Sequence, residues 1–314
     1  MKSFLIKLVT SVFIGAFFSA WVVQNVNLRE LATYPIDFTL IGLAIALSAA
    51  ALHLRAFRWQ KLLLPFIPLT YWQVFKALLV GHAMNVVLPA RLGELFRVNL
   101  CKKWYALSRS VALATLIWER IADGVTVVSC LIIGALSMNS LSHHEEVVGL
   151  IFIGTPLFFG TLFIFFLLRR HSLAHLLRNW PKLLARVLPF QKGVQEVPLS
   201  TLMGTIGLSL CVWTLEGLSL WAIVRGIGIA LTLLQTLLLV GVVSLSTLLP
   251  SPPGFLGTLQ FAFGISLLSA GCSAATGVLA ATLTQIFIFG CLAVTGMLLL
   301  GWTALKKPRL DVHT

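Results

Sequence analysis

The chain has 314 residues, of which 58% are hydrophobic and only 11% are charged, and its formal net charge is +13. Because an ordinary soluble domain has about 25% charged residues, this composition excludes a soluble globular protein and predicts an integral membrane protein. The excess of positive charge is typical of cytoplasmic loops and of surfaces that meet anionic lipids; without a motif or a basic stripe it does not favour nucleic-acid binding.

The first apolar segment, at about 4–24, follows a lysine and resembles a signal peptide. Its apolar run is long and has no clear A-x-A cleavage site, so we predict that it is retained as a first span. In chain order, the further predicted spans lie at about 38–54, 110–138, 147–168, 199–224 and 276–302. Two more apolar segments, at about 72–88 and 229–249, end in breaks that contain proline and glycine, and helix-like stretches follow at about 91–103 and 256–271.

Lysine and arginine predict the orientation of the spans. They are concentrated after the second span, after residue 168 and in the C-terminal tail, whereas the predicted outer loops 25–37 and 139–146 contain only Arg29. This places both termini in the cytoplasm. The basic residues assigned to the cytoplasmic loop after the second span are Arg55, Arg58, Lys61 and Lys76.

The segment LPARLGELFR, residues 88–97, places three charges between apolar runs. If 72–88 crossed the membrane completely, Lys102 and Lys103 would lie outside and the charge asymmetry would be lost. We therefore predict a re-entrant hairpin over 72–103 that enters from the cytoplasm, breaks at Leu88-Pro89 and returns. Irregular backbone at membrane depth has to be buried in protein or to line a wet cavity, so we expect these charges to face a polar cavity.

The segment LPSPPGFLGTLQFA, residues 249–262, resembles the first break. The preceding span runs in the opposite direction, so a second hairpin is expected to enter from the outer side. The pattern predicts an all-α, polytopic single domain over 1–314 with a pseudo-symmetric inverted repeat, the first repeat at about 38–138 and the second at about 199–302. Where the helix restarts, at Thr258, its N-terminus is suited to an anion, although a plain turn is the commoner outcome.

Residues 169–198 connect the two predicted repeats. Apolar residues recur at helical spacing within 171–190, and Arg178, Lys182 and Arg186 lie four residues apart on the other side. This predicts a basic amphipathic helix on the cytoplasmic membrane surface, kinked or divided at Pro181.

Charged residues cluster in the first hairpin and in the span after it. Glu94 lies three residues from both Arg91 and Arg97, so these three side chains can share one helix face. In the span 110–138, Glu119 and Asp123 lie four residues apart, and Arg120 lies three residues from Asp123. Two interpretations stay open. The charges can bind a phosphate-bearing headgroup through arginine, or they can form structural salt bridges between the hairpin and the span.

Glu216 is a lone acid within the span 199–224. It can pair with an arginine of the first hairpin, take up a proton, or form a hydrogen bond to a neighbouring helix as a neutral acid. The run His143-His144-Glu145-Glu146 lies in a short outer loop with no other nearby ligand, and the five cysteines form no CxxC pair, so we expect no metal and no cofactor. With no catalytic motif in the chain, we do not expect an enzyme.

The stretches GHAMNVVLPARLGELFR at 81–97, ERIADG at 119–124 and LLPSPPGFLGTLQ at 248–260 resemble the lysylphosphatidylglycerol synthase transmembrane-region family, a flippase-like domain. The resemblance covers nearly the whole chain and implies two re-entrant hairpins and a role in moving lipids. It marks as functional Arg91, Gly93, Glu94, Arg97, Glu119, Arg120 and Asp123. The second motif of the family usually ends in Gly-Thr-x-Glu, and Gln260 replaces that acid here.

We therefore expect a multi-pass protein of the bacterial cytoplasmic membrane that binds and translocates a phospholipid or a polyprenyl-phosphate-type lipid with an anionic or phosphate-bearing headgroup. The residues expected to bind it are Arg91, Glu94, Arg97, Glu119, Arg120, Asp123 and Glu216. The residues expected to shape the two breaks are Pro89, Gly93, Pro250, Gly254, Gly257, Thr258 and Gln260. A lipid-modifying transferase and a non-transporting subunit of an envelope lipid-synthesis complex are the alternatives.

Overall fold

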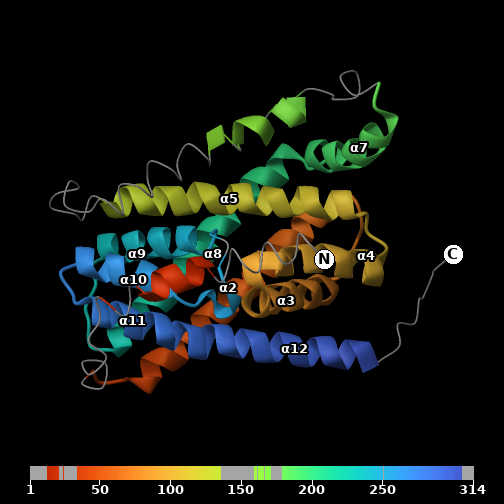
Figure 1. Cartoon of the computed structure of the whole chain (residues 1–314). Coiled ribbons are helices and arrows are strands. Elements are labelled where there is room, and N and C mark those ends of the chain that lie inside the picture. Colours follow the sequence, from red (N-terminus) through yellow and green to blue (C-terminus); the bar gives the residue numbers. More distant parts are fainter. Residues whose placement is uncertain are drawn as a thin grey trace.

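The computed structural model describes residues 13–20, 24, 34–135, 159–160, 162–165, 167–170, 179–249 and 251–305. Within these ranges the chain is helical and contains no β-strand (Figure 1). Three of the described helices are long and apolar enough to cross a membrane: α2 (Phe38–Leu63), α8 (Leu199–Gly226) and the continuous helix Ala274–Leu305. The prediction of an all-helical membrane protein is therefore confirmed.

The helix Ala274–Leu305 consists of α11 (Ala274–Leu283), a π-helical turn η5 (Thr284–Phe289) and α12 (Gly290–Leu305). A further long helix, α5 (Arg109–Ala135), packs against α8 and α9 and carries the acidic residues of the predicted span 110–138. The predicted spans at 4–24 and 147–168 lie mostly outside the described residues.

Two helical hairpins lie among these long helices. The first consists of α3 (Tyr71–Val87), the short helix η2 (Pro89–Arg91) and α4 (Leu92–Tyr105). A Thr70–Gln73 capping box starts α3, and Pro89 stands at the first position of η2. A Cβ atom on Gly93 would overlap the backbone of Gly81 and Asn85, so α3 and α4 can approach this closely only because Gly93 has no side chain.

The second hairpin consists of α9 (Leu233–Ser246), the short helix η4 (Pro253–Phe255) and α10 (Thr258–Ser269). Thr232 and Gln235 form a capping box at the start of α9, as Thr70 and Gln73 do in the first hairpin. Gly254 (φ 69°) and Gly257 (φ 79°) supply the left-handed backbone of the turn, while Pro250 lies outside the described residues.

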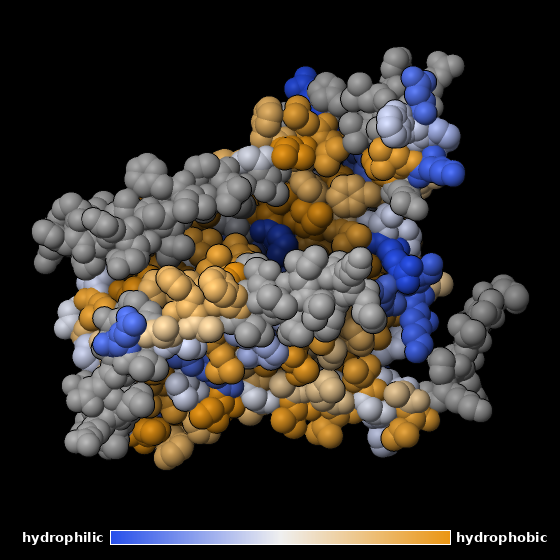
Figure 2. Space-filling model, in the orientation of Figure 1, coloured by the Kyte–Doolittle hydropathy of each residue, from blue (hydrophilic) through white to orange (hydrophobic). Residues whose placement is uncertain are grey.

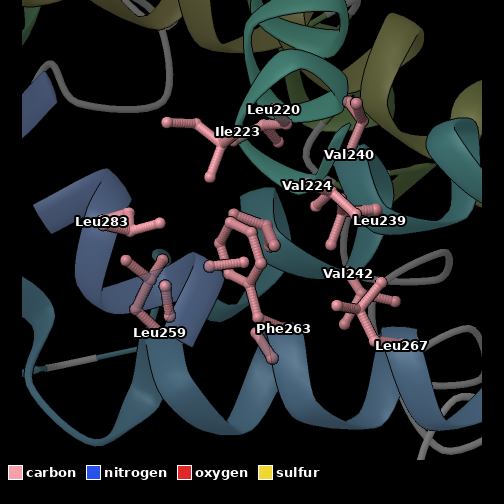
Figure 3. Close-up of a cluster of buried hydrophobic side chains, with 14 of the residues drawn as sticks. Leu220, Ile223, Val224, Leu239, Val240, Val242, Leu259, Phe263, Leu267 and Leu283 are labelled. Carbon is pink, nitrogen blue, oxygen red and sulfur yellow. The ribbon is translucent and has the colours of Figure 1, made fainter. Parts of the chain in front are cut away.

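The largest apolar core joins the second hairpin to α8 and α11. Its side chains come from all four helices and interdigitate around the fully buried Phe263 (Figure 3). A Cβ atom on Gly277 of α11 would lie 2.5 Å from the Cα of Gly264 in α10, so two small residues set this close helix contact. The core therefore holds the second hairpin firmly against the long helices.

The linker helix α7 (Pro181–Gln195) begins at Pro181, which fits the predicted division of the linker at this residue. Its C-terminal part belongs to the packed fold and does not lie free on a membrane surface, because Val194 is fully buried and Gly193 contacts Ala114 of α5. Arg169 secures this part by donating hydrogen bonds to the carbonyls of Val194 and Val197. Residues 171–178 of the predicted surface helix lie outside the described residues.

One predicted boundary is wrong. The second span was expected to end near residue 54, with Arg55 and Arg58 in a cytoplasmic loop, but α2 continues to Leu63 and both arginines are buried. No helix breaker occurs before Pro65, and acidic residues of neighbouring helices compensate the buried charge. Lys102 and Lys103 of α4, by contrast, are exposed, and hydrophilic side chains gather at that end of the molecule in Figure 2, whereas apolar side chains predominate along the helices.

Candidate functional site

A buried ion network connects α2 to α5. The fully buried Arg58 donates from Nη1 to Asp123 Oδ1 at 2.5 Å and from Nη2 to Asp123 Oδ2 at 3.2 Å. The same Nη2 lies 3.3 Å from Glu119 Oε1. Glu119 and Asp123 thus face the same way, as their spacing predicted, and the arginine fork binds Asp123 with two parallel bonds. Ser209 of α8 accepts a further hydrogen bond from Arg58.

Arg97 brings α4 into this network. Its guanidinium donates to Glu119, and its central carbon lies 4.0 Å from the ring centre of Trp59. Trp59 in turn donates from Nε1 to Thr115 Oγ1 at 3.2 Å. Because Arg97, Glu119 and Trp59 are all buried, the first hairpin is fixed to α2 and α5 by a charge pair and a ring contact.

Arg120 and Glu94 form a second, more open part of the network. Arg120 lies 3.4 Å from Asp123, as the spacing of three residues predicted, and 3.6 Å from Glu94. Arg91 does not lie on the helix face that its spacing from Glu94 and Arg97 predicted, because it precedes α4 with a left-handed backbone (φ 53°). Arg91 and Glu94 nevertheless line the same cavity.

Glu216 of α8 pairs with Arg55, whose Nη2 lies 3.1 Å from Glu216 Oε1. Ser48 also donates to this carboxylate at 3.4 Å, and Arg55 lies over the ring of Trp213 at 5.2 Å. Of the alternatives for Glu216, pairing with an arginine is what the structure shows, but this arginine comes from α2 and not from the first hairpin. Sequence reasoning missed Arg55 and Arg58 as members of the network, although their spacing of three residues already placed them on one helix face.

Arg91 occupies the turn of the first hairpin and reaches the second. It donates to the hydroxyl of Thr247 and lies over the ring of Phe255 at 5.9 Å. Within the described part of the chain, no carboxylate lies within ion-pair distance of Arg91. Among the described residues, Arg91 is thus a half-buried cation whose polar side-chain contact is to a hydroxyl and not to a carboxylate.

A cavity of about 380 Å³ lies between the two hairpins and the long helices. Its charged lining comes from α2, the first hairpin, α5 and α8, whereas α9, η4, η5 and α12 contribute uncharged side chains. The charged lining residues are Arg55, Arg91, Glu94, Arg120 and Glu216. Residues such as Ile45, Leu220, Val243, Ile288 and Leu292 make much of the remaining wall apolar. The cavity thus offers both charged and apolar side chains to one ligand.

Comparison with known proteins assigns the chain to a protein family. The family model described as the lysylphosphatidylglycerol synthase TM region matches residues 5–296. The chain belongs to this family. A membrane protein of the UPF0104 group from Methanocaldococcus jannaschii is 32% identical over 180 residues, which cover 57% of this chain and 76% of the relative. No solved structure matches the chain.

Gln260, which departs from the usual motif of the lysylphosphatidylglycerol synthase TM-region family, stabilises the turn of the second hairpin. Its Oε1 accepts from the backbone of Gly257 at 2.9 Å, and its Nε2 donates to Gln285 Oε1 at 2.6 Å. Gln285 then donates to the carbonyl of Gly254 at 2.8 Å. An uncharged pair of amides, rather than an acid, therefore fastens this turn to η5.

The hydroxyl of Thr258 does not line the cavity. The side chain is buried, and its oxygen lies 3.1 Å from Ser251 Oγ and 3.0 Å from the carbonyl of Phe255. The hydroxyl of Thr258 therefore takes part in the turn itself, and anion binding at the N-terminus of α10 stays a prediction. No cluster of three metal-binding side chains occurs among the described residues, and His143 to Glu146 lie outside them.

Proposed function

We propose that this protein binds a phosphate-bearing membrane lipid in the central cavity and moves it across the cytoplasmic membrane. The observation that carries the proposal is Arg91, a half-buried guanidinium with no carboxylate within ion-pair distance in the described part of the chain. It lies on the wall of a cavity that also has many apolar lining residues. Arginine binds phosphate oxygens with its planar fork, and the apolar wall suits acyl chains. Membership of a lipid-related membrane family supports the same function.

In this proposal the other charges have two roles. Arg55 and Arg120 flank Arg91 at the cavity, and each is already paired with a carboxylate that also lines the cavity. Arg58, Arg97, Glu119 and Asp123 lie deeper and hold α2, the first hairpin and α5 in register. The two interpretations left open by the sequence thus apply to different residues: one group meets the headgroup and the other fastens the helices.

The proposed topology places each hairpin in one half of the membrane. A helix needs roughly 20 residues to span the hydrocarbon core, whereas α3 has 17 residues, α4 and α9 have 14 and α10 has 12. The turns of the two hairpins meet each other, which suits entry from opposite sides. Both termini would then be cytoplasmic, and the regions 38–138 and 199–302 would form the two halves of an inverted repeat.

The direct test uses purified protein in vesicles that contain a tail-labelled fluorescent phosphatidylglycerol. A membrane-impermeant reductant destroys the label in the outer leaflet, so translocation appears as loss of the protected fraction. We expect wild-type protein to accelerate this loss and the Arg91→Ala variant, folded in detergent, to lose most of the acceleration. No acceleration by folded wild-type protein would overturn the proposal, and a covalently altered lipid in the mass spectrum would favour the transferase instead.

A further inference from the structure

We infer, resting on the function proposed above, that the cavity selects a headgroup with a single negative charge and no ammonium group. This corresponds to a phosphodiester, as in phosphatidylglycerol, rather than to a phosphomonoester or diphosphate. The inference comes from the balance of charge around the cavity. Buried charge without a counter-charge is disfavoured, so the headgroup has to complete this balance.

The described side chains in and behind the cavity wall contain five arginines and four carboxylates. Arg58 binds Asp123 and Glu119, and Arg97 also binds Glu119. Arg120 binds Glu94 and Asp123, and Arg55 binds Glu216. Once these pairs are made, the surplus is one positive charge, and it resides on Arg91. His82 also lines the cavity and adds no charge at about pH 8, where an ordinary imidazole is neutral.

The two carboxylates that face the cavity are not free to bind an ammonium group. The side chains of Glu94 and Glu216 are 23% and 24% exposed, and each already lies within ion-pair distance of an arginine. An ammonium group would compete with Arg120 or Arg55 for these oxygens and would leave a guanidinium unpaired. Zwitterionic headgroups are therefore disfavoured, although they also contain a phosphodiester.

A second negative charge on the headgroup would also lack a partner. Arg91 can neutralise one charge, and the nearest other cations, Arg55 and Arg120, are held by their own carboxylates. The uncharged lining from α9, η5 and α12 supplies hydroxyls such as Thr247 and Thr295 but no cation. A phosphomonoester, whose second proton leaves near pH 6, would bring two charges into a site where one arginine of the described residues, Arg91, has no carboxylate within ion-pair distance.

The test compares three lipids with the same labelled tail at about pH 8, in vesicles of unlabelled phosphatidylcholine. The labelled headgroups are phosphatidylglycerol, phosphatidylcholine and phosphatidic acid. We expect wild-type protein to move phosphatidylglycerol at least about tenfold faster than either of the other two, because like-charge contacts and unpaired charges are costly at such a site. Equal rates for phosphatidic acid or phosphatidylcholine would overturn the charge inference alone. No movement of any of the three lipids would overturn the proposed function and this inference together.

A charge variant makes the test specific. Glu216→Gln keeps the shape of the side chain but removes the nearer carboxylate partner of Arg55, which keeps only the contact of 3.9 Å to Asp123, so the surplus rises to two positive charges. We expect the rate for phosphatidic acid, relative to phosphatidylglycerol, to increase at least about tenfold. Glu196→Gln, the same change in a glutamate that pairs with Lys192 on the exposed surface of α7, is the matched control and should leave the ratio unchanged.

If Glu216→Gln does not fold, Glu94→Gln provides the second variant, because it removes a negative charge from the opposite part of the cavity wall. Folding is checked by thermal unfolding and gel filtration in detergent before the vesicles are made. A folded variant of either kind with an unchanged ratio would contradict the role of charge balance in selection.

Discussion

The backbone N–H of Ala90 donates a hydrogen bond to the backbone carbonyl of Ser251 at 3.1 Å. This bond joins the turns of the two hairpins, which are far apart in the sequence. At this junction, three non-glycine residues have a left-handed backbone: Ala90 (φ 54°), Arg91 (φ 53°) and Phe255 (φ 58°). Each such residue stores about 1–2 kcal/mol. Strain of this kind concentrates at sites that move or bind ligands, so the junction is the place where we expect the cavity to open.

Cross-linking the junction should stop translocation. Cysteines at Ala90 and Ser251, in a chain whose native cysteines are replaced by alanine, should form a disulfide because the two backbones are already in contact. We expect oxidised protein to lose lipid translocation and reduced protein to regain it. Each single-cysteine variant, treated with the same oxidant, serves as the control. Full activity in the cross-linked protein would show that the hairpins do not need to separate.

Arg91→Ala should reduce translocation of an anionic phosphodiester lipid at least about tenfold, because a buried charge-assisted contact to the headgroup is lost. In the described part of the chain its guanidinium donates to Thr247 and lies over the ring of Phe255, and it forms no ion pair, so thermal unfolding should change little. The matched control is Arg225→Ala, which removes an exposed arginine at the end of α8. Similar loss in both variants would mean that the effect is not specific to the cavity.

Arg58→Met should destabilise the protein by about 3–5 kcal/mol, because it leaves Asp123 buried without its main partner. The measurement is the thermal or denaturant unfolding midpoint in a fixed detergent. Adding Asp123→Asn to this variant removes the uncompensated charge and should recover part of the lost stability. The single variant Asp123→Asn gives the effect of that change alone. If the losses of stability in the two single variants simply add in the double variant, the two residues do not act as a pair.

Gln260→Glu, which restores the acid usual in the family motif, should destabilise this chain by about 1–3 kcal/mol. The new carboxylate would face Gln285 Oε1, and rotating that amide would break its bond to the carbonyl of Gly254. The unfolding midpoint measures the effect, and Gln235→Glu at the α9 cap is a matched control on the same hairpin. An unchanged unfolding midpoint for Gln260→Glu would contradict the role of the Gln260–Gln285 hydrogen bond in stabilising the turn.

The proposed topology predicts the side on which two exposed lysines lie. Cysteine replacements at Lys102 in α4 and at Lys192 in α7 should react with an impermeant maleimide from the cytoplasmic side and from no other. Sealed inverted and right-side-out vesicles, compared in parallel, give the readout. Labelling of position 102 from the outside would mean that the first hairpin crosses the membrane completely.

Much of the fold could be predicted from local signals. Proline and glycine marked both turns, so α3 and α4 begin and end within a few residues of the predicted positions 72–88 and 91–103. Helical spacing on α5 placed Glu119 and Asp123 on one face and Arg120 next to Asp123, and in the structure one arginine, Arg58, binds both acids. Such features depend on residues that are close in the chain.

The identity of that common arginine could not be predicted in the same way. Arg55 and Arg58 stand at the end of an apolar run, where the positive-inside rule assigns arginine to a cytoplasmic loop. The acidic partners of Arg55 and Arg58 are evident only from the tertiary contacts of α2 with α5 and α8. The left-handed turn at Ala90 and Arg91 also lacked a local signal, because neither residue is glycine.

The π-helical turn Thr284–Phe289 changes the direction in which side chains point along the helix Ala274–Leu305. An α-helix rotates by about 100° per residue, so one additional residue in a turn shifts everything that follows around the axis. Gln285, near the start of this turn, points to the second hairpin, while Ile288, Leu292 and Thr295 line the cavity. Deleting a single residue here would restore the regular winding and turn the following residues of the helix away from the cavity. In this protein an irregularity in one helix thus sets the direction in which the cavity-lining residues of α12 point.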